Sequence, residues 1–191
     1  MQQRIDLYGP VHKGLRAALC ETATRLGRTD FEARDESRAA AHAVARVLRF
    51  LDEHAEHEDA VILPELLRRS PDLHAELRAD HARLDGLQRE LDALAVRLES
   101  ATTAERVSLG ARIHERVWLL LGEHARHMQV EETRANRILH ANASDDELRI
   151  LQERIVGSIP SARMTEWMEI MLPALAASER AALEQSVGGA K

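Results

Sequence analysis

Hydrophobic residues recur along this chain at the three- and four-residue spacing of amphipathic helices, in four long segments. The segment after residue 70 is the most regular, because its leucines repeat every seven residues with others between them: Leu77, Leu84, Leu87, Leu91, Leu94 and Leu98. Such a repeat is typical of the core-facing seam of a helix in a bundle. No run of alternating Val, Ile or Thr favours a strand. The pattern therefore predicts an all-α protein.

Helix start and stop signals give the bounds of these four segments. Pro10 stands where a proline is favoured, at the first position of a helix. The pairs Thr29/Glu32 and Thr102/Glu105 have the spacing of a capping box. The expected helices cover residues 9–27, 29 to about 69, 70–100 and 102 to about 140.

Two shorter helices are expected after the fourth long one. Ser144 and Glu147 have the spacing of a further capping box, and the helix that they begin should end at Gly157. Beyond Pro160, Trp167 and several methionines lie on one face of a short amphipathic segment. Methionines in such a segment usually fill irregular gaps in a core.

Short links between the long helices determine the expected topology. Connections of two to four residues place consecutive helices side by side in opposite directions. We therefore expect an up-down-up-down four-helix bundle over residues 1–142. A C-terminal helical extension, residues 143–191, should pack on this bundle. Pro64 lies inside the second long helix and should kink or interrupt it.

Charge and cysteine content narrow the class of protein. The formal net charge of −6 argues against a nucleic-acid-binding protein, which is usually basic. The longest apolar runs are too short to cross a membrane, and the first residues lack the apolar stretch of a signal peptide. Cys20 is the only cysteine and cannot form an internal disulfide, so a reducing, cytoplasmic compartment is expected. We expect Cys20 to be a small core residue.

Two of the long helices carry a histidine four residues before a glutamate. The pairs are His54/Glu58 and His127/Glu131, and residues at this spacing lie on one face of a helix, one turn apart. An imidazole and a carboxylate in this arrangement can bind one metal ion. The spacing alone is weak evidence, because 10 histidines and 32 acidic residues give roughly two such pairs by chance.

The position of these residues is more informative than their spacing. Both glutamates lie on the apolar stripes of their helices, and a carboxylate that is buried without a partner costs several kcal/mol. Single histidines, His12 and His81, lie on the inward faces of the other two long helices. Local hydrogen bonding of half-buried polar residues is the alternative for any one of them. Six such residues on four helices favour a metal site.

The ligand types limit which metal is expected. Mixed imidazole and carboxylate ligands suit iron, manganese or zinc. Two carboxylates from separate helices can bridge two ions, which favours a dinuclear centre. Ferritin-like di-metal bundles use Glu-x-x-His, and no histidine in this chain follows a glutamate at that spacing.

The order of these residues resembles the hemerythrin-like (HHE cation-binding) domain family over about residues 6 to 140, as does the stretch Glu-Asp-Ala-Val-Ile-Leu-Pro after the first pair. The resemblance implies a four-helix bundle around two non-haem iron ions. By the same resemblance, the two glutamates bridge the irons and the four histidines complete the centre. The implied metal ligands are His12, His54, Glu58, His81, His127 and Glu131.

One position departs from the family's reversible oxygen carriers. Those proteins have a second histidine one turn before the third-helix ligand, where this chain has Leu77. His74 lies two turns from His81, and His124, one turn before His127, is a possible substitute. The departure leaves oxygen carriage, redox turnover and sensing of iron, oxygen or nitric oxide as open alternatives.

The expected function is binding of, or reaction with, dioxygen or a related small diatomic ligand by a monomer or homodimer. A catalytic di-iron enzyme, such as one with peroxidase-like activity, is one alternative. The other is a degenerate helical bundle that acts as a structural or protein-interaction module without a functional di-iron site. Tyr8 lies one turn before His12 and could point into the site. Whether His57, His124 or Asp85 joins the ligands is also open.

Overall fold

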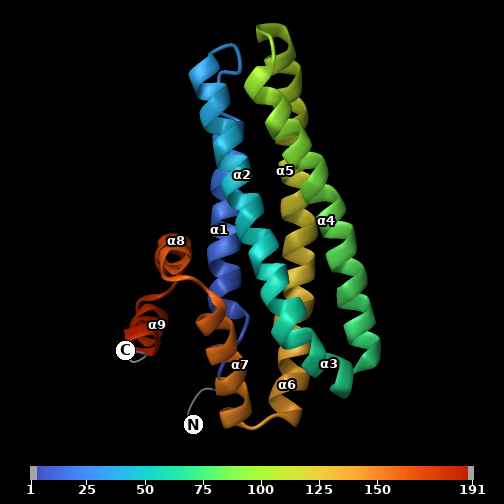
Figure 1. Ribbon diagram of the computed structural model, residues 1–191, viewed down its shortest axis with the longest axis vertical. Helices are drawn as coiled ribbons and strands as arrows, with labels where there is room; N and C mark the ends of the chain where they lie inside the picture. Colours follow the sequence, from blue (N-terminus) through green and yellow to red (C-terminus); the bar gives the residue numbers. More distant parts are fainter. Residues whose placement is uncertain (1–3, 189–191) are drawn as a thin grey trace.

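The computed structural model describes residues 4–188, and every regular element within that range is helical, which confirms the predicted all-α class. Four long helices lie side by side along the molecule (Figure 1). They are α1 (Gly9–Leu26), α2 (Arg34–His57), α4 (Pro71–Ser100) and α5 (Thr103–Val130). Helix α1 packs against α2 and α5, and α4 packs against the same two helices.

Helices α2 and α5 each continue, through one π-helical turn, into a further helix. The turn η1 (Glu58–Ile62) leads into α3 (Leu63–Arg69), and η2 (Glu131–Ala135) leads into α6 (Asn136–Asn142). Pro64 is the second residue of α3. The interruption predicted at this proline is therefore a π turn just before it. Pro64 itself lies in the first turn of α3, where the missing backbone N–H of a proline is tolerated.

The C-terminal helices cover one end and one side of the long helices. Helix α7 (Asp145–Ser158) contacts the η1 turn, and α8 (Ser161–Met171) packs against α1. A short 3₁₀ turn, η3 (Leu172–Ala174), leads to α9 (Ala177–Gly188), which lies beyond α8 in Figure 1. Within the described range, no helix is long and apolar enough to cross a membrane.

Two of the three predicted capping boxes are confirmed. At the start of α5, the backbone N–H of Glu105 donates to the hydroxyl of Thr102, and the backbone N–H of Thr102 donates to the Glu105 carboxylate. Ser144 and Glu147 make the same pair of hydrogen bonds at the start of α7. Each box satisfies two N–H groups that a helix N-terminus otherwise leaves without partners.

The capping box predicted at Thr29–Glu32 is wrong, because α2 begins after this stretch. The Thr29 hydroxyl donates to the carbonyl of Arg25, one turn back in α1. The backbone N–H of Asp30 donates instead to the carboxylate of Glu36, inside α2. Thr29 of the link therefore satisfies a carbonyl at the end of α1, and Glu36 of α2 satisfies a backbone N–H of the link.

Cys20 is exposed, so its prediction as a core residue is also wrong. The buried face of α1 follows Leu15, Leu19, Ala23 and Leu26. Cys20 directly follows Leu19, and adjacent helical residues point about 100° apart. It therefore falls outside the buried stripe.

Two separate apolar clusters fill the interior. The first lies among α1, α2, α4 and α5 and includes Trp167 and Ile170 of α8. The second contains Tyr8 with residues of η1, α3, η2, α6 and α7 and the first turns of α4. Along the chain, the clusters meet between Tyr8 and Leu15, Leu51 and Val61, Leu77 and Leu91, and Met128 and Ala135. Buried polar residues occupy that boundary.

Candidate metal centre

The six residues predicted as metal ligands are all buried, at the boundary between the two apolar clusters or next to it. They come from six different elements, α1, α2, η1, α4, α5 and η2. The structure arranges them in two groups of four ligand atoms, and the atoms of each group lie within 4.8 Å of one another. The groups are His12, His54, Glu58 and Glu131, and Glu58, His81, His127 and Glu131.

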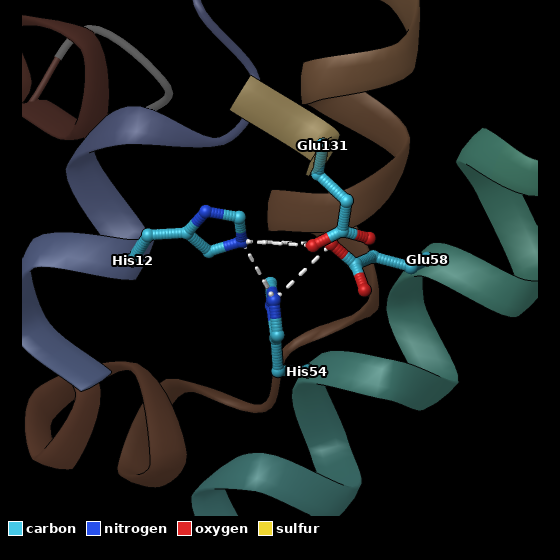
Figure 2. A group of neighbouring side chains, drawn as sticks. All are labelled: His12, His54, Glu58 and Glu131. Atoms are coloured by element: carbon cyan, nitrogen blue, oxygen red, sulfur yellow. Dashed lines mark hydrogen bonds and ion pairs between the residues drawn. The ribbon is translucent and has the colours of Figure 1, made fainter. Parts of the chain in front are cut away.

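Figure 2 shows the first group, in which the two imidazoles and the two carboxylates converge on one small volume. The carboxylate of Glu58 belongs to both groups. Its Oε1 lies 3.1 Å from Nε2 of His54, and its Oε2 lies 3.4 Å from Nε2 of His81. One oxygen therefore serves each group.

The carboxylate of Glu131 is divided in the same way. Its Oε2 lies 3.5 Å from Nε2 of His12, and its Oε1 lies 3.3 Å from Nε2 of His127. Glu58 and Glu131 thus each present one oxygen to each pair of histidines. This is the arrangement that two carboxylates need to bridge two adjacent cations.

The histidines meet in pairs through their Nε2 atoms. The Nε2 atoms of His12 and His54 are 3.0 Å apart, and those of His81 and His127 are 3.1 Å apart. A neutral imidazole has one N–H and one lone pair, and metals bind the lone pair. Two Nε2 atoms that face the same carboxylate oxygens can therefore act as ligands to one ion.

The outer nitrogen of His12 is held by a carboxylate. Its Nδ1 lies 3.0 Å from Oε1 of Glu132, and that oxygen also accepts a 2.7 Å hydrogen bond from Arg16. A carboxylate that accepts from Nδ1–H fixes the tautomer in which Nε2 keeps its lone pair. Glu132 directly follows Glu131 in the sequence.

His81 is held by an equivalent contact on the other side of the centre. Its Nδ1 lies 2.8 Å from Oδ1 of Asp59, whose other oxygen accepts from Arg78. Asp59 directly follows Glu58. Glu58 and Glu131 are therefore each followed by an acid that orients a histidine of another helix, and the sequence analysis did not identify this pattern.

Neither oxygen of Glu58 or Glu131 has a hydrogen-bond partner in the described part of the chain. The nearest ring nitrogens lie 3.1 to 3.5 Å from these oxygens and make no hydrogen bond to them. A buried carboxylate without partners is strongly disfavoured. Cations between the two histidine pairs would satisfy all four oxygens at once, so the residues present fit a dinuclear metal centre.

The carboxylates also control the charge of the histidines. Burial lowers the pKa of His12, but its contacts with Glu132, Glu58 and Glu131 outweigh burial and raise the pKa to about 9. Burial likewise opposes protonation of His81, and Glu58, Asp59 and Glu131 raise its pKa to about 9. Without a metal, the centre therefore holds protons where cations would bind.

The two π turns begin at Glu58 and Glu131 themselves. The backbone N–H of Leu63 donates to the carbonyl of Glu58, and that of Asn136 donates to the carbonyl of Glu131, five residues back in each case. Single π turns inside α-helices are frequent at functional sites. Pro64 indicated the first turn as an interruption, and no sequence signal indicated the second.

Several other candidates lie outside the two groups. His74 is only partly buried and contributes no ligand atom to either group. The side chain of Asp85 is 57% exposed, pairs with Arg89 and contributes no ligand atom to either group. Leu77 is fully buried in the apolar cluster that contains Tyr8. The position of the extra histidine in oxygen carriers is therefore part of an apolar wall here.

Tyr8 lies close to the centre, as expected from its position one turn before His12. Its ring centroid is 5.5 Å from that of His12, and its hydroxyl is buried without a hydrogen-bond partner in the described residues. Burial raises the pKa of Tyr8 well above its usual value, and the charges of Glu131 and Glu58 raise it further. The hydroxyl therefore stays protonated.

Two cavities reach the centre from different sides. A cavity of about 670 Å³ lies between α2 and α4 and is lined by His54, Glu58, His81, His124 and His127 together with charged residues. A smaller, mostly apolar cavity of about 120 Å³ lies under α7 and α8 and also touches His54 and Glu58. A small ligand therefore has a route to the metal-facing atoms.

Comparison with models of known protein families and with curated proteins gave no match to this chain. The observations that bear on its function are therefore those of its own structure. It is an all-helical protein in which buried histidines and glutamates form two adjacent groups that could hold metal ions.

Proposed function

We propose that this protein is a hemerythrin-like di-iron protein that binds, or reacts with, dioxygen or a related small diatomic ligand. One observation carries the proposal: the carboxylates of Glu58 and Glu131 each direct one oxygen to each of two histidine pairs. The proposed iron ligands are His12, His54, Glu58, His81, His127 and Glu131.

The proposed fold is the up-down-up-down four-helix bundle of that family, over residues 1–142, with residues 143–191 as a helical extension packed on it. The ring of contacts from α1 through α2, α4 and α5 back to α1 supports this arrangement. The short link of η3, and the contacts of α8 with α1 and of α7 with η1, support the extension as a cover over one face of the bundle.

Iron is proposed because four imidazoles and two carboxylates form a mixed set that suits iron, manganese or zinc, and because a bridged pair suits redox chemistry. When bound, two irons would supply reversible electron storage and an open position for a small ligand. The protein's own part is to keep a lone pair on the Nε2 atoms of the histidines, where a metal ion would bind. Glu132 and Asp59 hold His12 and His81 in the metal-binding tautomer, and apolar clusters flank the centre on two sides.

We further propose a cytoplasmic protein that acts as a monomer or homodimer. Its only cysteine, Cys20, is free and exposed. Exposed free thiols are maintained in reducing compartments. Gel filtration coupled to light scattering measures the oligomeric state directly.

Metal analysis tests the function. Protein purified without a tag and loaded with ferrous iron should contain about two irons per chain, because two ligand groups are present. After exposure to air, it should show the absorption bands of an oxo-bridged ferric pair. A content below one iron per chain, with no such bands, would contradict the proposal.

A double variant separates this function from a purely structural module. In Glu58→Ala/Glu131→Ala protein, both bridging carboxylates are lost. Iron should raise the melting temperature of the wild type by several degrees, since it binds only the folded chain. The double variant should show no such rise. A structural module predicts equal melting temperatures with and without iron in both proteins.

A further inference from the structure

The larger of the two cavities joins the protein surface to the centre. Its lining includes the buried ligands Glu58 and His127 and also three exposed acids, Asp52, Glu56 and Asp92. Asp52 and Glu56 lie one turn apart on α2, and Asp92 lies on α4, so the acids come from both walls of the cavity. We call these three residues the acidic mouth.

The charge of the acidic mouth is not balanced by nearby arginines. Three arginines line the same cavity, and each forms an ion pair with another acid: Arg49 with Glu166, Arg78 with Asp59, and Arg89 with Asp85. The acids of the mouth form no ion pair within the described residues, and the one contact of Asp52 is with the neutral amide of Gln88. Three negative charges therefore remain uncompensated where the cavity meets solvent.

The inner end of the cavity also lacks positive charge. Glu58 is only 2% exposed and lines the cavity, and neither of its oxygens has a hydrogen-bond partner in the described part of the chain. A buried carboxylate of this kind needs a cation. Carboxylates therefore lie at both ends of one cavity, exposed and unpaired at the surface, buried and unpartnered at the centre.

The smaller cavity offers a cation no comparable path. It also touches Glu58, but most of its lining is apolar, with Ile155, Trp167 and Met168 among the residues. An ion that moves from water into apolar surroundings loses its hydration without replacement, and this is strongly unfavourable. Of the two cavities, the larger one is therefore the route that suits a charged species.

A cleft lined by charges of one sign concentrates ions of the opposite sign and raises their association rate by about 10- to 1,000-fold. We propose that divalent metal ions enter the centre through the larger cavity, and that Asp52, Glu56 and Asp92 form a transient site that captures them on the way. The inference rests on the proposed metal-binding function and adds the route by which that centre is loaded.

The rate of metal uptake tests the route. Metal-free protein is mixed with cobalt(II) chloride in a stopped-flow spectrometer, and the visible absorption of bound cobalt is followed. In Asp52→Asn/Glu56→Gln/Asp92→Asn, the second-order rate constant at low ionic strength should fall about tenfold. The cobalt content at saturation should stay at the wild-type value, because no proposed ligand is changed. Asparagine at position 52 can still accept the hydrogen bond from Gln88.

Ionic strength separates electrostatic capture from damage to the centre. In 1 M salt the screening length falls to about 3 Å, so the acidic mouth no longer acts on an approaching ion. The rates of the wild type and the triple variant should then converge. A tenfold difference that persists in 1 M salt would mean that the substitutions altered the ligands, and would overturn the capture site.

A matched control removes the same amount of charge elsewhere. Asp35, Glu115 and Glu153 are exposed acids that line neither cavity. The variant Asp35→Asn/Glu115→Gln/Glu153→Gln should keep most of the wild-type rate. Equal slowing in both triple variants would mean that only the net charge of the protein matters, and would overturn the acidic mouth.

Two bulky substitutions distinguish the cavities from each other. Ala82 is exposed and lines the larger cavity, so Ala82→Trp should slow cobalt uptake at low and high salt alike. Met168 lines the smaller cavity, and Met168→Trp should leave the rate unchanged. The opposite result, with slowing only in Met168→Trp, would show entry under the extension and overturn the proposed route.

The cobalt content of the wild type separates failure of the route from failure of the function. A wild-type chain that binds neither cobalt nor iron would overturn the metal centre and its entry route together. Full cobalt content with the same uptake rate in every variant would overturn the route alone and leave the centre in place.

Discussion

Oδ1 of Asp59 lies 2.8 Å from Nδ1 of His81, although the two residues are on different helices. Asp59 is also the residue after Glu58, whose own carboxylate points into the centre. One π turn therefore carries both a carboxylate that belongs to both ligand groups and the acid that orients a histidine of another helix. Glu131 and Glu132 repeat this relationship with His12.

Removal of an orienting acid should weaken metal binding without removing a ligand. We expect Asp59→Ala and Glu132→Ala each to lower the affinity for ferrous iron or zinc by about 10- to 100-fold, the usual effect of losing a partner of a ligating histidine. Competition against a chromophoric chelator measures this affinity. Asp85→Ala is the control, since that exposed side chain pairs with Arg89. Unchanged affinity in the first two variants would show that these acids do not orient the ligands.

Metal-free protein should lose stability as the pH rises from about 6.5 to 9. The folded-state pKa of both His12 and His81 is about 9, above the unfolded value near 6.5. Their protonated forms therefore stabilise the fold fully below pH 6.5, and this contribution disappears as the pH rises through 9. Thermal melts across this range measure the effect.

The same protons compete with metal ions, so metal affinity should increase over the same pH range. A His12→Gln/His81→Gln variant should flatten the pH dependence of the metal-free melting temperature. His42→Gln is the control, because His42 is exposed and lies 3.7 Å from Glu99, away from the two ligand groups. An equally steep pH dependence in the double variant would rule out these two histidines as its source.

Tyr8→Phe should leave metal-free protein as stable as the wild type or more stable, by up to about 1 kcal/mol. The Tyr8 hydroxyl is buried without a partner, and its removal keeps the ring that packs in the second apolar cluster. Urea denaturation measures the free energy of unfolding. A loss of more than about 1 kcal/mol would mean that the hydroxyl has a partner in solution, such as a bound water.

The extension is attached to α2 through Glu53. The Glu53 carboxylate accepts a 2.9 Å hydrogen bond from Arg163 and a 3.1 Å hydrogen bond from the indole N–H of Trp167. Glu53→Ala should therefore loosen α8 and shift the fluorescence of buried Trp167 to longer wavelength. The measurement needs a Trp118→Phe background, because Trp118 is 49% exposed.

Glu169→Ala is the matched control for the extension. Glu169 also joins α8 to α2, through Arg46, but both of these side chains are largely exposed. Exposed ion pairs contribute little to stability. The control should keep the emission of Trp167 unchanged, and an equal shift in both variants would mean that general loosening, rather than the Glu53 contacts, is being measured.

Local patterns in the sequence predicted the elements well. The leucine repeat from Leu77 to Leu98 and the capping boxes at Thr102 and Ser144 each depend on residues a few positions apart. The histidine–glutamate pairs were found for the same reason, because the i, i+4 spacing fixes a shared face. His12 and His81 required an argument about which face is inward, and the structure brings both into the ligand groups.

The contacts that orient the ligands could not be predicted, because they join residues that are far apart in the chain. His12 and Glu132 are separated by 120 positions, and His81 and Asp59 by 22. The π turn at Glu131 contains no proline or glycine that would have predicted it from the sequence. Thr29 does not cap α2, because its hydroxyl donates to the carbonyl of Arg25 in the preceding helix. Which of these bonds forms depends on the path of the link between the helices.

Each π turn also sets the rotational phase of the helix on either side of it. An extra residue in the turn offsets the following helix by about 100° relative to an uninterrupted α-helix. A variant that lacks Ala60 could close η1 into regular α-helix. Either His54 and Glu58 or the apolar face of α3 would then turn away from the interior. We therefore expect the chain to tolerate substitutions near the centre more readily than a change in its length. Single-residue deletions in the π turns should be the most damaging changes there.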